Sequence, residues 1–196
     1  MKILLDNGHG ENTPGKRSPK WSDGTQLFEW KYTREIDLRV EMELQKQGID
    51  AERIVRESAD ISLSERCRRA NAIATKAGVK NCLLVSIHNN ASANGSASGW
   101  ECHIYTSKTR TKDYAVIFAN EAKAEFGQDW KIRQPIPYQP YWVSNFQILR
   151  DTKCPAILTE NLFMDNINDC RYLLSSQGKN AIVNIHVQSI LKIVGK

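Results

Sequence analysis

Residues 82–92 read Cys-Leu-Leu-Val-Ser-Ile-His-Asn-Asn-Ala-Ser, an apolar run that ends in a histidine and two asparagines. A continuous apolar run of this length is typical of a central strand that is covered on both faces, as in parallel sheets. It predicts a strand over Asn81–Ile87 and places His88 just beyond the end of that strand. Taken alone, the stretch leaves open whether His88 caps a core or binds a ligand.

Outward from this stretch, predicted strands alternate with predicted helices. Runs of strand length cover Lys2–Asp6, Ile49–Val55, Gly99–Thr106 and Ala156–Glu160. Apolar residues at helical spacing, and a capping box at Ser62–Glu65, predict helices over Arg34–Gln47, Ser62–Ala77, Lys112–Phe126 and Lys179–Val194. This alternation predicts an α/β fold of three layers, in which helices flank a twisted, mostly parallel sheet.

Length and charge narrow the class of protein. A chain of 196 residues suits one domain, so we expect a single catalytic domain over residues 1–196. The net charge of +5 comes from scattered basic residues without a continuous basic run, which argues against a nucleic-acid-binding surface. The chain has no apolar stretch of about 20 residues, the length that a transmembrane helix needs. Ile3–Leu5 is too short for the apolar core of a signal peptide.

The five cysteines are odd in number and form no Cys-x-x-Cys pair. This pattern argues against a zinc ribbon and against a complete disulfide framework. We therefore expect reduced, mostly buried thiols.

Four segments place polar residues where the sheet is expected to bind ligands, beyond the carboxyl ends of its strands. His9 follows the first strand between two glycines, His88 follows the central strand, Glu160 ends the last strand, and Glu29 precedes the first helix. Two imidazoles and a carboxylate can form a three-ligand zinc site that keeps a fourth position for water. A second carboxylate beside it can then move protons. Each residue alone has a structural alternative, and only the combination indicates a metal-dependent hydrolase.

The order and spacing of five motifs carry a resemblance to a known family. From Ile3 to about Val194, the chain resembles the zinc-dependent N-acetylmuramoyl-L-alanine amidases of the amidase-3 type. The motifs are Leu5-Asp6-Asn7-Gly8-His9-Gly10, Phe28-Glu29-Trp30, Ser62-Leu63-Ser64-Glu65-Arg66 with Ala70-Asn71, Ser86-Ile87-His88-Asn89-Asn90-Ala91, and Cys154-Pro155-Ala156-Ile157-Leu158-Thr159-Glu160-Asn161.

The resemblance implies a fold similar to that of zinc carboxypeptidases and other phosphorylase/hydrolase-like proteins. It implies that His9, Glu29 and His88 bind Zn²⁺ and that Glu160 is the catalytic acid and base. The implied reaction is hydrolysis, in peptidoglycan, of the amide bond between the lactyl group of N-acetylmuramic acid and L-alanine of the stem peptide. The implied partner is this muropeptide substrate, bound by a monomer that acts on the cell wall. A phage or prophage endolysin, cytoplasmic until its release, and a bacterial enzyme that has lost a leader both fit.

Several points stay open at this stage. Arg150 is expected either to grip a substrate carboxylate or to form a surface salt bridge. Asn161-Leu162-Phe163 departs from the small residue and Gly-Phe that many family members carry, which leaves the pocket wall in doubt. In regulated family members a helix plugs the site, and here the corresponding segment is Ser107–Asn145. A zinc carboxypeptidase or other amidohydrolase, and a wall-binding module without turnover, are the alternative functions.

Overall fold

A computed structural model describes residues 1–92, 94–106 and 109–196. Residues 107 and 108, which begin the segment Ser107–Asn145, lie outside the described residues. The strands are β1 (Lys2–Asn7), β2 (Ala51–Arg53), β3 (Cys82–Asn90), β4 (Glu101–Ile104), β5 (Trp142–Val143) and β6 (Ala156–Phe163). The helices are α1 (Glu29–Lys46), α2 (Leu63–Ala77), α3 (Thr109–Phe126), α4 (Gln147–Arg150), α5 (Ile167–Leu174) and α6 (Ser176–Val194), with a short 3₁₀ helix, η1 (Val79–Asn81).

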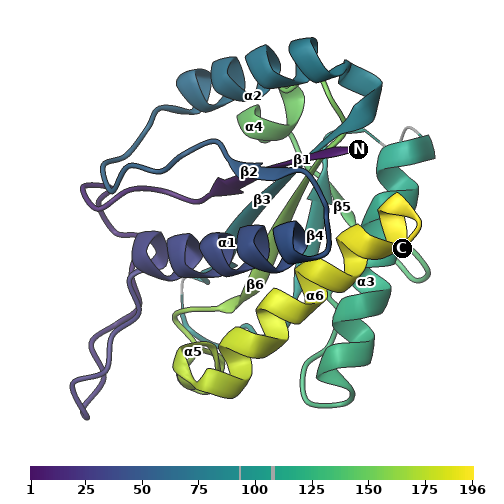
Figure 1. The fold of residues 1–196 in the computed structure, drawn as a ribbon. Coiled ribbons are helices and arrows are strands. Elements are labelled where there is room, and N and C mark those ends of the chain that lie inside the picture. The colour runs from purple at the N-terminus through teal and green to yellow at the C-terminus, as the bar shows by residue number, and fades with distance from the viewer. Residues whose placement is uncertain (93, 107–108) are drawn as a thin grey trace.

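The described strands form one sheet in the order β2-β1-β3-β6-β4-β5. The four strands β2, β1, β3 and β6 run parallel, whereas β4 runs antiparallel to β6 and carries β5 parallel to itself. In Figure 1, α2 and α4 cover one face of this sheet, and α1, α3, α5 and α6 cover the other. This confirms the predicted three-layer architecture with a mostly parallel sheet.

A hydrophobic core fills the space on each face of the sheet. The side chains of β1 point alternately into the two cores: Ile3 and Leu5 face the larger core, and Leu4 faces the smaller one. The central strand contributes in the same way, with Leu83 and Val85 on one side and Leu84 on the other. Burial on both faces explains why the sequence of β3 is continuously apolar rather than alternating.

Two expected boundaries are wrong in a way that matters for the site. Strand β3 continues to Asn90 instead of ending at Ile87, because its pairing with β6 includes His88 opposite Glu160. Helix α1 begins at Glu29 rather than near Arg34, since the N–H groups of Lys31 and Tyr32 already bond to the carbonyl of Phe28. His88 is therefore held inside a strand, and Glu29 is held in the first turn of a helix.

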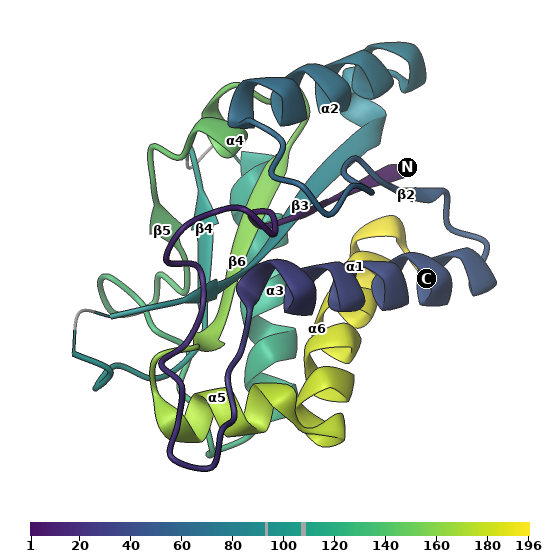
Figure 2. The ribbon, with the colours of Figure 1, turned by 90° about the vertical axis from the view of Figure 1, so that its left-hand side faces the viewer.

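The long segment between β1 and α1 is an ordered loop that runs beside α5 (Figure 2). The indole N–H of Trp21 donates to the Cys170 sulfur over 3.4 Å, and Arg171 pairs with Asp23 at 3.0 Å.

All five cysteines are free and buried, which confirms the prediction of reduced thiols. In the described part of the chain, no helix combines the length and the apolar character needed to cross a membrane.

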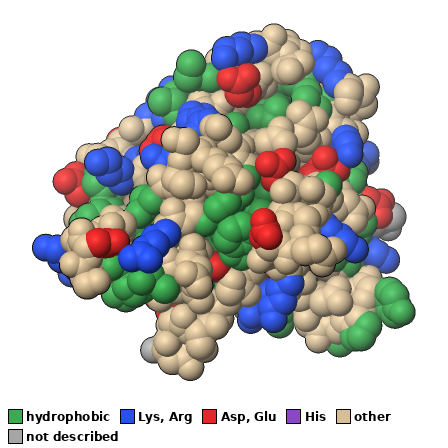
Figure 3. All heavy atoms as spheres, turned by 90° about the horizontal axis from the view of Figure 1, so that it is seen from below, with side chains coloured by type: hydrophobic (Ala, Val, Ile, Leu, Met, Phe, Trp, Pro, Cys, Tyr) green, Lys and Arg blue, Asp and Glu red, His purple; other side chains and the backbone are tan. Residues whose placement is uncertain are grey.

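On the face of the molecule shown in Figure 3, basic and acidic side chains are interspersed. Individual pairs of opposite charge join the helices that lie on one side of the sheet. Lys192 of α6 pairs with Glu121 of α3, and Lys179 of α6 pairs with Glu35 of α1. This pattern is expected of solvated helix surfaces, where each pair contributes little to stability.

Candidate metal centre

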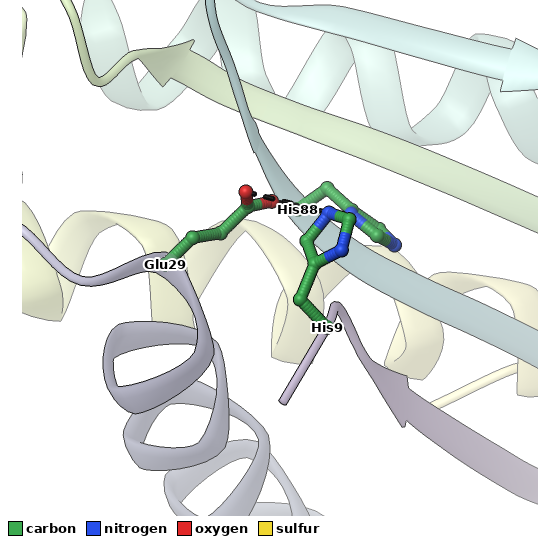
Figure 4. A group of neighbouring side chains, drawn as sticks. All are labelled: His9, Glu29 and His88. Atoms are coloured by element: carbon green, nitrogen blue, oxygen red, sulfur yellow. Dashed lines mark hydrogen bonds and ion pairs between the residues drawn. The ribbon is translucent and has the colours of Figure 1, made fainter. Parts of the chain in front are cut away.

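Three separate elements bring His9, Glu29 and His88 together, as Figure 4 shows. His9 lies two residues beyond β1, in the left-handed region of backbone conformation with φ of 59°. Glu29 is the first residue of α1, and His88 lies near the carboxyl end of β3. Residues that are far apart in sequence thus meet at the edge of the sheet where parallel strands end, the usual place for a ligand in this fold class.

Glu29 lies between the two imidazoles. Its Oε2 atom is 3.4 Å from Nε2 of His9, and its Oε1 atom is 3.2 Å from Nδ1 of His88. The two rings are nearly perpendicular, with an interplanar angle of 88° and centroids 5.1 Å apart. One ligand atom from each residue lies within 4.8 Å of the others, so the three could hold one metal ion.

A test of this fit comes from the carboxylate of Glu29. The side chain is 1% exposed, and Oε2 has no hydrogen-bond partner among the described residues. Burying such an oxygen without a partner is costly, unless a cation completes its environment. Ligand atoms on a tetrahedral zinc ion lie about 3.3 Å apart, close to the two contacts of Glu29. The donor set therefore fits a metal ion, with one ligand atom from each residue within 4.8 Å of the others.

The ionisation of the three residues follows from their burial and from one another. Burial lowers the pKa of His9 to about 4, despite the opposing charge of Glu29. Burial alone would raise the pKa of Glu29, but the hydrogen bond and charge of His88 lower it. The same contact outweighs burial at His88 and raises the pKa of that imidazole. A carboxylate that stays ionised beside imidazoles is the form that can bind a metal.

Glu160 lies beside this cluster, because it pairs with His88 across β3 and β6 and with Glu101 across β6 and β4. Burial raises the pKa of its carboxyl to about 8. The Oε2 atom of Glu160 has no hydrogen-bond partner among the described residues. A carboxyl whose pKa lies near neutrality is suited to take up and return a proton.

Arg66 of α2 fixes the backbone that carries His9. Its guanidinium is 2% exposed and donates to the carbonyl of His9 over 3.0 Å, to the carbonyl of Asn7, and to Asp6 over 2.7 Å. The other carboxylate oxygen of Asp6 accepts a 2.6 Å hydrogen bond from Ser86 of β3. The rigid fork of an arginine can satisfy several acceptors at once, and here it holds the turn after β1 against α2.

Gly8 leaves room for the second imidazole. A Cβ atom at this position would lie 2.4 Å from Nδ1 of His88. The glycine next to His9 therefore makes space for the imidazole of His88.

The other candidate residues lie outside the cluster. Arg150, at the end of α4, pairs with Asp151 at 2.8 Å and bonds to Asn145. This is the surface salt bridge that the sequence offered as the alternative to substrate binding. Leu162 is fully buried in the larger core, with φ of 61°, so the departure from glycine concerns packing and backbone conformation rather than an exposed pocket wall.

Sequence reasoning missed Arg66 and Asn161 as neighbours of the site. Both lie inside the motifs that carry the family resemblance, but their partners are backbone carbonyls that no sequence pattern reveals. The two remaining histidines, His103 and His186, are buried, and His103 bonds to Glu101 and Ser144.

A three-layer α/β fold with two histidines, a glutamate and a further carboxyl at one sheet edge defines a candidate metal-dependent hydrolase. The chain matches a family model described as N-acetylmuramoyl-L-alanine amidase over residues 3–192, and it belongs to that amidase-3 family. By its family and its named relatives it is an N-acetylmuramoyl-L-alanine amidase.

Curated relatives are similar over nearly the whole chain. An amidase of Bacillus licheniformis, CwlM, is 28% identical over 98% of this chain and 68% of its own length. The endolysin of Bacillus phage SPP1 is 28% identical over 98% of this chain and 65% of its own length. The chain thus spans about two thirds of each of these relatives.

Solved structures confirm the fold. The catalytic domain of the amidase CwlV of Bacillus (Paenibacillus) polymyxa superimposes with a TM-score of 0.80 at 20% identity, covering 100% of this chain and 99% of that one. The amidase of Clostridium difficile 630 also gives 0.80, at 24% identity, with 100% of this chain and 97% of that chain covered.

Proposed function

We propose that this amidase uses His9, Glu29 and His88 to hold a zinc ion and Glu160 to move the proton, within a single catalytic domain over residues 1–196. The observation that carries the proposal is the convergence of the three ligands on one edge of the sheet, with Glu160 paired to His88 in the adjacent strand. Because one chain supplies all four residues, we propose that the active form is a monomer.

Zinc is the metal that this donor set favours, since two imidazoles and a glutamate are a known catalytic zinc set. A zinc ion here would supply a Lewis acid and a water that ionises near neutral pH. The buried carboxylate of Glu29 would balance part of the positive charge of the ion. The turn held by Arg66 and the strand β3 would keep both imidazoles in place.

The proposed substrate bond is the amide between the lactyl group of N-acetylmuramic acid and L-alanine of the stem peptide. In its hydrolysis, the oxygen of water bonds to the lactyl carbonyl carbon and the C–N bond breaks. Glu160 takes a proton from the attacking water and passes it to the departing alanine nitrogen, which leaves as an amine. A pocket of about 180 Å³ adjoins His9 and His88.

The names of the relatives support action on the cell wall. They include a sporulation-specific amidase of Bacillus subtilis, probable cell wall amidases of Staphylococcus and the SPP1 phage endolysin. We propose that this chain acts on peptidoglycan in the same way, either as a cellular enzyme or as an endolysin that reaches the wall after release.

Mass spectrometry of digested peptidoglycan tests the proposed function. The expected result is free stem peptides that begin with L-alanine, together with glycan strands that keep their lactyl groups. A chelator is expected to abolish both products, and added zinc to restore them. Release of residues from the carboxyl end of the stem peptide would instead assign a carboxypeptidase, and binding without any product would assign a wall-binding module.

A further inference from the structure

A groove of about 560 Å³ lies beside the metal centre, between the loop after His9 and the start of α1. The loop side runs from Glu11 to Arg17, and the helix side consists of Phe28, Trp30 and Lys31. Its lining includes residues that are close in sequence to two proposed metal ligands, because Glu11 follows His9 by two positions and Phe28 and Trp30 flank Glu29. Its volume falls within the range of about 300–1,000 Å³ that ligand sites usually occupy.

The groove is electropositive. Lys16, Arg17 and Lys31 contribute positive charges to its lining, and Glu11 is the acidic residue among its described lining residues. Among the ion pairs of the described residues, none involves any of these four side chains. Arg17 differs in this respect from most other arginines of the protein, which do have a carboxylate partner.

The backbone of Lys16 connects the lining of the groove to a proposed metal ligand. Its backbone carbonyl accepts a 3.1 Å hydrogen bond from the N–H of Glu29. The loop that carries Lys16 is thus tied directly to the backbone of a proposed metal ligand.

The loop that forms one wall is held in place by backbone contacts. The N–H of Glu11 bonds to the carbonyl of Ser58 over 2.8 Å, and Gly10 and Thr13 bond to each other twice. The amide of Asp60 donates to the side chain of Asn12 over 2.7 Å. A wall that is already ordered loses little conformational entropy when a ligand binds, which favours recognition.

The charge of the groove discriminates between the two sides of the proposed substrate. The glycan side consists of neutral N-acetylated sugars and a lactyl group whose carboxyl is consumed in the amide. The peptide side carries free carboxylates. We infer that this groove binds the carboxylate-bearing stem peptide on the leaving-amine side of the scissile bond, with Lys16, Arg17 and Lys31 as the residues that contact the carboxylates.

Aromatic side chains add to this interpretation. Phe28 is 39% exposed, and Trp30 is held by Arg34, whose guanidinium lies 5.7 Å from the indole centroid and donates to the Trp30 carbonyl. The two rings add apolar surface to the lining of the groove, against which the aliphatic parts of a peptide can pack. The combination of fixed aromatic surface and flexible cations suits a peptide better than a uniform phosphate polymer.

This inference rests on the proposed function. A comparison of two substrates distinguishes a failure of the inference from a failure of the proposed function. One substrate is a soluble muramyl-peptide with free peptide carboxylates, and the other is the same compound with those carboxylates amidated. The variants are a triple change, Lys16→Gln, Arg17→Gln and Lys31→Gln, and a matched control on exposed helix lysines, Lys46→Gln, Lys76→Gln and Lys112→Gln.

The measured quantity is the ratio of kcat/KM for the free-carboxylate substrate to that for the amidated one. We expect wild type and the control to prefer the free carboxylates on the order of tenfold, as three exposed ion pairs with the substrate would allow. The triple variant is expected to lose this preference through a higher KM for the charged substrate. High salt is expected to reduce the preference of wild type, because the contacts are exposed to solvent.

Two results would overturn the inference while leaving the proposed function intact. One is turnover of both substrates by wild type with equal kcat/KM. The other is a defect of the triple variant confined to walls that carry phosphate polymers, which would assign the groove to a polyanion. Absence of lactyl-alanine cleavage in both substrates would contradict the proposed function itself.

Discussion

The side-chain amide of Asn161 donates a hydrogen bond to the backbone carbonyl of His88 over 3.0 Å. The bond lies where the register of β3 and β6 shifts, because Glu160 to Phe163 on β6 spans one residue more than His88 to Asn90 on β3. At such a bulge the regular ladder is interrupted. The carboxamide of Asn161 therefore ties the strand of a proposed metal ligand to the strand of the proposed acid and base.

We expect Asn161→Ala to weaken both stability and metal binding. The same carboxamide accepts from the indole of Trp100 over 2.9 Å and donates to Thr159, so its loss leaves buried groups unpaired. The expected cost is about 2–4 kcal/mol in the free energy of unfolding, with zinc affinity lowered on the order of tenfold. Denaturant unfolding and competition with a chelator measure the two effects. Asn184→Ala, at an exposed asparagine of α6, is the control and is expected to change neither.

Gly8→Ala is expected to displace His88. The added methyl group would lie 2.4 Å from a ring nitrogen that a neighbouring carboxylate holds in place, so the imidazole must move. We expect zinc affinity to fall about 10- to 100-fold in a chelator competition. Gly127→Ala is the control, because its new methyl group meets open space; φ of 58° strains alanine there, so we expect a loss of stability but unchanged zinc affinity. Equal zinc affinity of the two variants would show that zinc binding does not depend on the present position of His88.

Arg66→Met is expected to be strongly destabilising. Removing the guanidinium leaves the carboxylate of Asp6 buried without its cation and the carbonyls of Asn7 and His9 without their donor. Breaking a buried pair of this kind costs about 3–5 kcal/mol. Arg68→Met on the same helix removes an exposed pair with Glu65 and is expected to cost less than about 1 kcal/mol. Similar losses at the two positions, measured by urea unfolding, would contradict the role assigned to Arg66.

The stability of the fold is expected to depend on pH through His186. This side chain is fully buried, donates to the carbonyl of Ile182 and accepts from Thr159, and burial lowers its pKa to about 4. The unfolded chain therefore binds the proton more readily between about pH 6.5 and pH 4. The stabilising contribution of neutral His186 is fully present above pH 6.5 and is lost as the pH falls towards 4, by about 3 kcal/mol.

The free energy of unfolding of wild type and His186→Gln, measured from pH 7 to pH 4.5, tests this effect. The two curves are expected to converge at low pH, because the glutamine variant lacks the titrating group. Parallel curves would show that His186 contributes no pH dependence.

The comparison of sequence with structure shows what local patterns can predict. The run before His88 predicted a central strand because burial on both faces leaves a continuous apolar signal. The capping box at Ser62 predicted α2, and the Ser62 hydroxyl does accept from the N–H of Glu65. The four residues of the proposed site could be predicted from the sequence, because the ends of parallel strands meet at one edge of the sheet.

The remaining features depend on contacts that are distant in sequence. The short strand β5 and the helices α4 and α5 were not expected, since two to eight residues give too little periodicity. The extension of β3 to Asn90 depends on pairing with β6, whose partner residues lie about seventy positions further along the chain. The same holds for Arg66, because a cationic side chain in a helix shows no sign that it will be buried.

The central claim is that Glu160 moves the proton at a metal centre formed by His9, Glu29 and His88. The most direct measurement is the rate of muropeptide cleavage by purified Glu160→Ala, made on a sample whose bound zinc has been determined. We predict one equivalent of zinc, as in wild type, with turnover reduced about 10²- to 10⁴-fold. Wild-type turnover in this variant with zinc bound would contradict the account.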